Sequence, residues 1–244
     1  MPDHPMKNPN AVIVFARTPE ITRSVADEPF AALPWDDLDA IFHACLRDIV
    51  DRAAGIPAVD VIVYRNERYL PAAKMSPPGE NIRMLDMPDG EYDRVVGQAV
   101  ENAFLEYYHR VVVVLENNPL VGTGLIRRAF DLLGTEDDAV VVTPAADGRA
   151  AMLALKANHP SVFRPGAFPS AKGEGIMSRL CALDVHIYPT TPTAPIFAVD
   201  SPGTIDRLRR YVAGMDPSDP SFPKQTSGVF RSLEKKYRLK KAHA

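Results

Sequence analysis

The polar residues best suited to chemistry follow an apolar run in the middle of the chain. Residues 111–115 are apolar and mostly β-branched, which predicts a strand buried on both faces. Glu116, Asn117 and Asn118 come directly after this run, and Pro119 follows them. Ligands of open α/β sheets bind at the carboxyl ends of such strands. The function therefore depends on what these three polar side chains can hold.

The two asparagines have two interpretations. Their amides could recognise a base or a ribose, because each amide carries both a donor and an acceptor. Alternatively, they could make the side-chain to backbone hydrogen bonds that close the turn before Pro119.

A second group of candidates follows an earlier apolar segment. Residues 11–16 predict the first buried strand, and Ala16, Arg17 and Thr18 stand at its carboxyl end. Arg17 could contact a nucleotide base or phosphate, or it could be an ordinary surface arginine. A nucleotide lying across the ends of both strands would be near Ala16, Arg17 and Asn117.

Three further residues carry titratable groups that could act in a site. Asp147 could be a metal ligand or a general base, although an Asp-Gly pair such as Asp147-Gly148 is also common in turns. Asp200 is expected to cap the last helix of the globular part together with Ser201 rather than to bind a metal. His186 is expected to be a satisfied histidine inside an apolar strand.

The elements that must position these residues alternate between strands and helices. Such a series predicts a three-layer α/β/α fold with a mostly parallel sheet and helices on both faces. Strands are expected at residues 11–16, 59–64, 82–85, 111–115, 139–143, 150–155, 185–188 and 196–200. Helices are expected at residues 36–49, 92–104, 123–133, 176–183 and 202–212, with Thr123 capping the third of them and Gly134 ending it.

The C-terminal part differs in composition from the rest. Residues 1–215 are expected to form one α/β domain, and residues 216–244 a proline-containing linker followed by a basic helix. Six basic residues and one acid, Glu234, lie between positions 231 and 241. Such a helix could bind an acidic partner or anionic lipid. We expect instead that its apolar side docks on the same chain or forms a homodimer.

Composition limits the classes of function. The chain has 244 residues and a net charge of −3, so its overall charge predicts no nucleic-acid partner. No apolar run approaches the roughly 20 residues that a membrane span needs, and the polar N-terminus is no signal peptide. Cys45 and Cys181 are isolated in sequence and are expected to be buried free thiols. The sequence therefore predicts a cytoplasmic globular protein.

Four segments, in this order along the chain, resemble one known family. They are Phe15-Ala-Arg-Thr-Pro19, the central strand with Asn117-Asn118-Pro119, Thr143-Pro-Ala-Ala-Asp-Gly148, and Val199-Asp-Ser-Pro202. As a set they resemble the bacterial nucleotide-diphospho-sugar transferase-like proteins, over roughly residues 11–212. The resemblance implies the fold that many sugar-nucleotide transferases and nucleotidyltransferases share.

The chain departs from that family where the chemistry should be. The family has Pro-Gly and then basic residues after Pro19, and here only Arg23 could still meet a phosphate. The family has a metal-binding Asp at the strand end, which matches Asn117 in this chain. At an effective dielectric of about 20, losing a carboxylate beside a dication forfeits on the order of several kcal/mol of attraction. The resemblance therefore implies a degenerate metal site, with Mg²⁺ or Mn²⁺ as cofactor only if the protein is active.

The resemblance implies a glycosyl- or nucleotidyl-transferase that uses a nucleotide-activated donor. Asp147 would be catalytic and would face the acceptor, and no residue is assigned to a metal. The alternative is a catalytically inactive binding or assembly protein that keeps the fold, which the missing Asp at position 117 favours. The expected ligand is a nucleotide sugar or a nucleotide, held by Ala16, Arg17, Thr18, Arg23, Asn117 and Asn118.

Overall fold

The chain folds around a seven-stranded sheet. The computed structural model describes residues 8–16, 33–66, 79–115, 117–135, 138–146, 149–164 and 174–242. The strand order is β3-β2-β1-β4-β6-β5-β7. Only β6 runs against its neighbours among these strands, so the predicted mostly parallel sheet is confirmed. The strands are β1 (Asn10–Phe15), β2 (Val59–Arg65), β3 (Ile82–Asp86), β4 (Arg110–Val114), β5 (Ala139–Pro144), β6 (Ala150–Leu155) and β7 (His186–Pro189).

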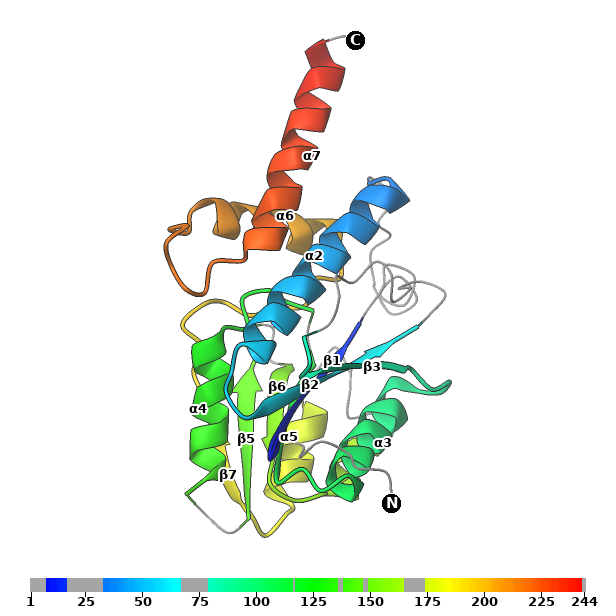
Figure 1. The fold of residues 1–244 in the computed structure, drawn as a ribbon, viewed down its shortest axis with the longest axis vertical. Helices are drawn as coiled ribbons and strands as arrows, with labels where there is room; N and C mark the ends of the chain where they lie inside the picture. Colours follow the sequence, from blue (N-terminus) through cyan, green and yellow to red (C-terminus); the bar gives the residue numbers. More distant parts are fainter. Residues whose placement is uncertain are drawn as a thin grey trace.

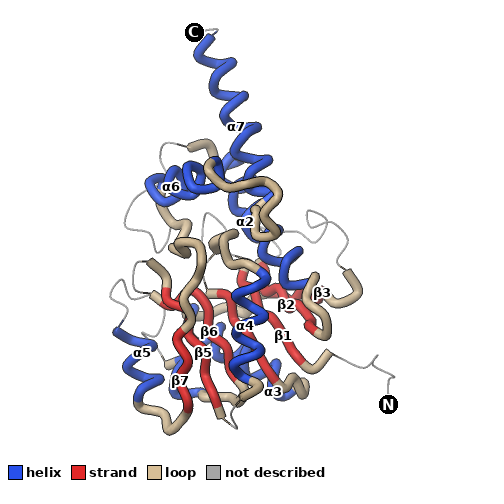
Figure 2. The backbone as a smooth tube through the Cα atoms, turned by 90° about the vertical axis from the view of Figure 1, so that its left-hand side faces the viewer, coloured by secondary structure: helices blue, strands red, loops and turns tan. Residues whose placement is uncertain are grey.

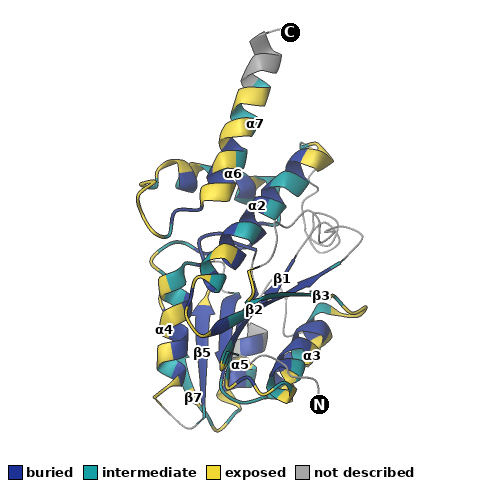
Figure 3. Ribbon diagram, viewed as in Figure 1, coloured by how far each residue is buried: buried dark blue, intermediate teal, exposed yellow. Residues whose placement is uncertain are grey.

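Helices cover both faces of the sheet, which confirms the predicted three layers (Figures 1 and 2). On one face lie α2 (Trp35–Ala54) and α4 (Thr123–Leu133). On the other face lie α3 (Tyr92–Leu105), the 3₁₀ helix η2 (Pro160–Phe163) and α5 (Glu174–Cys181). The central strands are buried from both sides, as Figure 3 shows, because their β-branched side chains alternate between the two layers.

A third apolar core lies beyond the carboxyl ends of the strands. It joins the N-terminal half of α2 to α6 (Pro202–Ala213) and α7 (Lys224–Ala242), which stand above the sheet in Figure 1. Ser201 begins α6 with a capping box, because its hydroxyl accepts from the Thr204 N–H at 3.2 Å and Thr204 Oγ1 accepts from the Ser201 N–H at 2.9 Å. The members of this core include Leu38, Phe42, Phe197, Leu208 and Phe230.

Helix α7 packs along α2 of the same chain and runs in the opposite direction. The Asp48 carboxylate accepts hydrogen bonds from the N–H groups of Gln225 at 3.0 Å and Thr226 at 2.8 Å, at the start of α7. Further along, the buried Asp37 carboxylate accepts from Lys236 Nζ at 2.6 Å. The division of the chain at residue 215 and a homodimer through α7 both stay predictions.

Several local expectations were wrong. Residues 196–200 form no strand. Residues 196–199 are buried, and their carbonyls accept single hydrogen bonds instead of a ladder: Ile196 O from the Ala146 N–H at 2.6 Å and Phe197 O from the Asn118 amide at 2.8 Å. His186 is exposed because it begins the edge strand β7, and Cys181 is exposed at the end of α5. Gly122, one residue earlier than expected, is the N-cap of α4.

Among the helices that the structure describes, none combines the length and the apolar character needed to cross a membrane.

Candidate functional site

One described candidate from each group, Ala16 and Asn117, lies at the carboxyl ends of β1 and β4. These strands pair in parallel, with Val14 opposite Val114, so Ala16 and Asn117 follow the ends of neighbouring strands. The Ala16 N–H donates to Tyr64 O at 2.8 Å, which extends the pairing with β2 beyond the last residue of β1. The juxtaposition expected from the sequence is therefore present.

Asn117 has an unusual environment. The residue is 5% exposed, yet neither its amide nitrogen nor its amide oxygen has a hydrogen-bond partner in the part of the chain that the structure describes. Each unpaired buried polar group costs on the order of 1–3 kcal/mol. Ligand-binding positions are among the places where proteins keep unpaired buried polar groups, so Asn117 is a candidate for contact with a ligand.

Asn118, the next residue, is held completely differently. It is fully buried, its amide nitrogen donates to Phe197 O at 2.8 Å, and its amide oxygen accepts from the Leu120 N–H at 2.9 Å. These bonds close the turn at residues 117–121, which was one of the two interpretations of the asparagine pair. A nucleotide contact by Asn118 stays a prediction.

A cluster of aromatic rings supports the strand ends on the α3 side of the sheet. Phe15, the last residue of β1, stacks on Tyr64 of β2 with ring centroids 5.4 Å apart. The Tyr92 ring meets Phe15 edge-on at 5.6 Å, and its hydroxyl donates to Leu115 O at 3.3 Å. The first residue of α3 therefore ties together the last residues of β1 and the segment leading to Asn117.

Two arginines at the same sheet edge were not singled out in the sequence. Arg65 ends β2 beside Ala16, and its guanidinium lies 3.7 Å from the exposed carboxylate of Asp86. Arg149 precedes β6 and pairs with Asp200 at 3.1 Å. Arg17 is a candidate because it is a cation that follows an apolar strand, and the same criterion also selects Arg65. Arg149 could not be found in this way because β6 runs in the opposite direction.

The remaining predicted site residues lie outside the described residues. These are Arg17, Thr18, Arg23 and Asp147, together with Glu116. Their roles stay predictions.

The described residues at the strand ends do not fit a divalent cation. No group of three or more His, Cys, Asp or Glu side chains with metal-binding geometry occurs in the described part of the chain. Asn117 offers a neutral oxygen, and the Asp200 carboxylate is neutralised by Arg149. Mg²⁺ or Mn²⁺ as a cofactor therefore stays a prediction.

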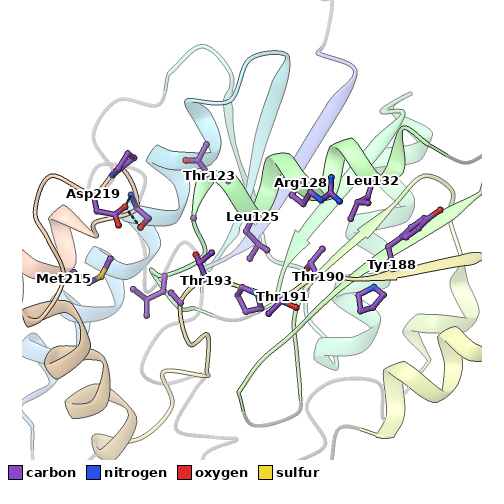
Figure 4. Close-up of a pocket in the computed structure, with 18 residues that line it drawn as sticks. Thr123, Leu125, Arg128, Leu132, Tyr188, Thr190, Thr191, Thr193, Met215 and Asp219 are labelled. Atoms are coloured by element: carbon purple, nitrogen blue, oxygen red, sulfur yellow. Dashed lines mark hydrogen bonds between the residues drawn. The ribbon is translucent and has the colours of Figure 1, made fainter.

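A groove of about 930 Å³ lies beside the turn at residues 117–121. Figure 4 shows Leu125, Arg128 and Leu132 of α4 along one side and the segment from Tyr188 to Thr193 along the other. Its volume suits a small organic molecule. Its walls are mainly apolar and hydroxyl-bearing, with one cation, Arg128, and one carboxylate, Asp219, among the lining residues.

The groove and the strand ends are adjacent but distinct. The described candidates Ala16, Asn117 and Asn118 do not line the groove, which begins at Leu120 and Gly122. We place the candidate site at the strand ends, because the buried unpaired amide is there and the groove's described lining offers no comparable group. The groove borders the Asn118-anchored turn at Leu120.

Comparison with known proteins connects this geometry to one family. The family described as "Guanylyl transferase CofC like" matches residues 32–168, which is more than half of the chain. A comparison with curated proteins found no match.

Solved structures share the fold at low sequence identity. A proposed nucleotide-diphospho-sugar transferase from Desulfovibrio desulfuricans G20 aligns with a TM-score of 0.69 and 14% identity, covering 93% of this chain and 98% of that one. A 4-diphosphocytidyl-2C-methyl-D-erythritol synthase from Anaerococcus prevotii DSM 20548 aligns with a TM-score of 0.56 and 9% identity, covering 84% and 96%. Rv0371c from Mycobacterium tuberculosis H37Rv aligns with a TM-score of 0.50 and 17% identity, covering 83% and 98%. These likenesses confirm the nucleotide-diphospho-sugar transferase-like fold.

Proposed function

Because the chain belongs to the CofC-like guanylyl transferase family, we propose that it is a nucleotidyltransferase that binds a nucleoside triphosphate at the ends of β1 and β4. It would transfer the nucleotidyl group to an oxygen of a small acceptor and release pyrophosphate. This narrows the expectation from the sequence, which left glycosyl and nucleotidyl transfer open.

The observation that carries the proposal is the unpaired amide of Asn117. A primary amide that is 5% exposed and fully unpaired presents a donor and an acceptor side by side. The edge of a nucleobase and the hydroxyls of a ribose present the complementary pattern. A bound nucleotide would thus remove the cost that the ligand-free protein carries at this position.

The charge at the sheet edge also supports an anionic ligand. Arg65 is the last residue of β2 and Arg149 directly precedes β6, so two guanidinium groups lie at this edge of the sheet. A guanidinium group binds phosphate in a bidentate manner. Their acidic partners are not deeply buried, since the Asp86 side chain is 74% exposed and that of Asp200 is 28% exposed. A polyphosphate that approaches this edge could replace these carboxylates.

One observation favours a second candidate function, a catalytically inactive member that binds nucleotide as a sensor or assembly module. Asn117 stands where the family resemblance has a metal-binding carboxylate, and the described residues form no divalent site. Binding without turnover would distinguish this function from the first. Asp147 as the catalytic residue and Arg17, Thr18 and Arg23 as phosphate contacts belong to the transferase proposal.

Thermal unfolding with nucleotides tests the proposal directly. The protein is melted with GTP, ATP, CTP, UTP and the corresponding nucleotide sugars at millimolar concentration, each with and without Mg²⁺ or Mn²⁺. A ligand at a hundred times its Kd stabilises a protein by about 2.7 kcal/mol. For a chain of this size, that raises Tm by about 5–10 °C.

Pyrophosphate release, followed with the stabilising nucleotide and a panel of phosphorylated acceptors, then separates the two candidates. Stabilisation with release supports the transferase, and stabilisation without release supports the binding module. No shift with any nucleotide would contradict both.

A further inference from the structure

Arg52, near the end of α2, joins two segments that are far apart in the sequence. Its part-buried guanidinium donates to the carbonyl oxygens of Pro119 and, at 3.4 Å, Val121 in the turn after Asn117. It also donates to Ser221 O, which lies just before α7. Three carbonyl acceptors from two segments therefore converge on one side chain.

Two side chains, Asn118 and Arg52, hold the turn at residues 117–121. Asn118 binds Phe197 O and the Leu120 N–H through its side chain, while Asn118 O accepts from the Val121 N–H at 3.2 Å. The Pro119 and Val121 carbonyls of the same turn accept from Arg52. Since Asn117 begins this turn, the position of its unpaired amide depends on both anchors.

The second segment bound by Arg52 leads into α7. Asp48, one helical turn before Arg52, accepts from the first N–H groups of α7 and from the Thr226 hydroxyl at 2.7 Å. The same side of α2 therefore holds both the base of α7 and the turn after the central strand. Figure 1 shows α7 lying against α2 above the ends of the strands.

We propose that Arg52 is a positioning residue for the nucleotide site: it fixes the turn that carries Asn117, and the docked base of α7 holds Arg52 in place. The proposal rests on the proposed function. Lysine cannot replace arginine here, because its ammonium is a single point charge, whereas the planar guanidinium directs five N–H donors to acceptors that lie in different directions.

The burial of this cation supports a specific role. Burial lowers the pKa of the Arg52 guanidinium, while the neighbouring Asp48 and Asp219 carboxylates oppose that change. No salt bridge to Arg52 occurs among the described carboxylates within 4.0 Å; its donors are directed at neutral carbonyls instead. A part-buried cation bound to backbone carbonyls fixes chain geometry rather than balancing a single charge.

The test compares Arg52→Lys and Arg52→Ala with the matched variants Arg47→Lys and Arg47→Ala. Arg47 lies on the same helix, and its guanidinium meets the exposed Asp51 at 3.7 Å, away from the turn. Amide hydrogen exchange is measured in the nucleotide-free full chain, on peptides that cover Leu120 and Val121. We expect exchange at these two amides to rise at least about tenfold in both Arg52 variants and to stay within twofold of wild type in both Arg47 variants.

The second measurement is the affinity for the nucleotide that stabilises the wild-type protein most. Arg52→Lys should weaken binding about tenfold, and added guanidinium should restore a large part of the binding to Arg52→Ala. That rescue distinguishes a local positioning role from a general loss of fold. Arg47→Ala should bind as the wild type does.

The two readouts separate the outcomes. Unchanged exchange at Leu120 and Val121 in Arg52→Lys overturns the proposal, whatever the nucleotide affinity. Faster exchange with unchanged affinity overturns the positioning role. If the wild-type chain binds no nucleotide, the proposed function fails, and the exchange data still decide whether Arg52 holds the turn.

Discussion

Replacing Asn117 with leucine should stabilise the ligand-free protein and abolish nucleotide binding. Leucine branches at the same carbon as asparagine and has the same number of side-chain heavy atoms, but its methyl groups take up more volume, so part of the gain is offset by tighter packing. The substitution removes two buried polar atoms that have no hydrogen-bond partner among the described residues, so no described hydrogen bond is broken. The usual result of replacing a buried asparagine is a loss of stability, so the predicted sign is a strict test.

The magnitude follows from the number of unpaired groups. Each buried unpaired polar group costs on the order of 1–3 kcal/mol. Allowing for the different shape of leucine, the free energy of unfolding should rise by about 1–2 kcal/mol. For a chain of this length, that corresponds to a Tm increase of about 2–8 °C.

The neighbouring asparagine is the matched control. Asn118→Leu removes the same chemical group one residue away, but it breaks the bonds to Phe197 O and the Leu120 N–H and leaves both buried groups unpaired. The expected loss is about 2–6 kcal/mol. The two variants should therefore shift Tm in opposite directions.

The assay is thermal and urea unfolding of wild type, Asn117→Leu and Asn118→Leu, each with and without the stabilising nucleotide. Asn117→Leu should melt at a higher temperature than wild type and show no further shift with nucleotide. If it instead loses as much stability as Asn118→Leu, the Asn117 amide is paired in the ligand-free protein. The argument that a ligand completes its bonds would then be refuted.

Three other outcomes are expected. Asn117→Asp should melt at a lower temperature than wild type, because an unpaired buried carboxylate destabilises the fold. Mn²⁺ should raise the Tm of this variant but not the Tm of wild type. If calorimetry detects no Mn²⁺ binding to the variant, the idea of a metal site that lost its charge is contradicted. A thiol reagent should titrate the exposed Cys181 in the native protein and reach Cys45 only after unfolding, because burial raises the pKa of the Cys45 thiol to about 12. Hydrogen bonds from the Ser221 hydroxyl and N–H lower the pKa of Asp219 in the folded protein. The ionised carboxylate therefore stabilises the fold above the pKa of the unfolded chain, and this stabilisation is lost as the pH falls through the lower folded pKa. Between pH 5 and about pH 2, the Tm of Asp219→Asn should fall by less than the Tm of wild type.

The sequence was sufficient for most of the fold because local patterns specify it. Runs such as residues 111–115 are too apolar for any exposed element, and their alternation with amphipathic helices leaves few arrangements other than a parallel sheet. The apolar segment at residues 196–200 predicts a strand on the same grounds, and that prediction is wrong. Phe197 and Val199 are buried in the third core, and a burial pattern cannot reveal that none of the described strands pairs with this segment.

The candidate site was predictable only in part. The proximity of Ala16 and Asn117 follows from the rule that parallel strands end at one edge. The difference between Asn117 and Asn118 does not, because Asn118 is satisfied by Phe197, 79 residues further along the chain. Arg52 was equally hidden, since its acceptors at Pro119 and Ser221 are brought together only by the packing of α2 against the turn and α7.

The contrast between the two asparagines also bears on how this chain departs from its family resemblance. If the amide at position 117 were a passive replacement for a lost carboxylate, nothing would favour keeping it unpaired, since an apolar residue would stabilise the strand end. The unsatisfied Asn117 amide lowers the stability of the ligand-free protein. At the same time, hydrogen bonds from Asn118 and Arg52 fix the turn that positions this amide. That combination is expected where a ligand completes the bonding, and it argues for recognition at this edge whether or not nucleotidyl transfer follows.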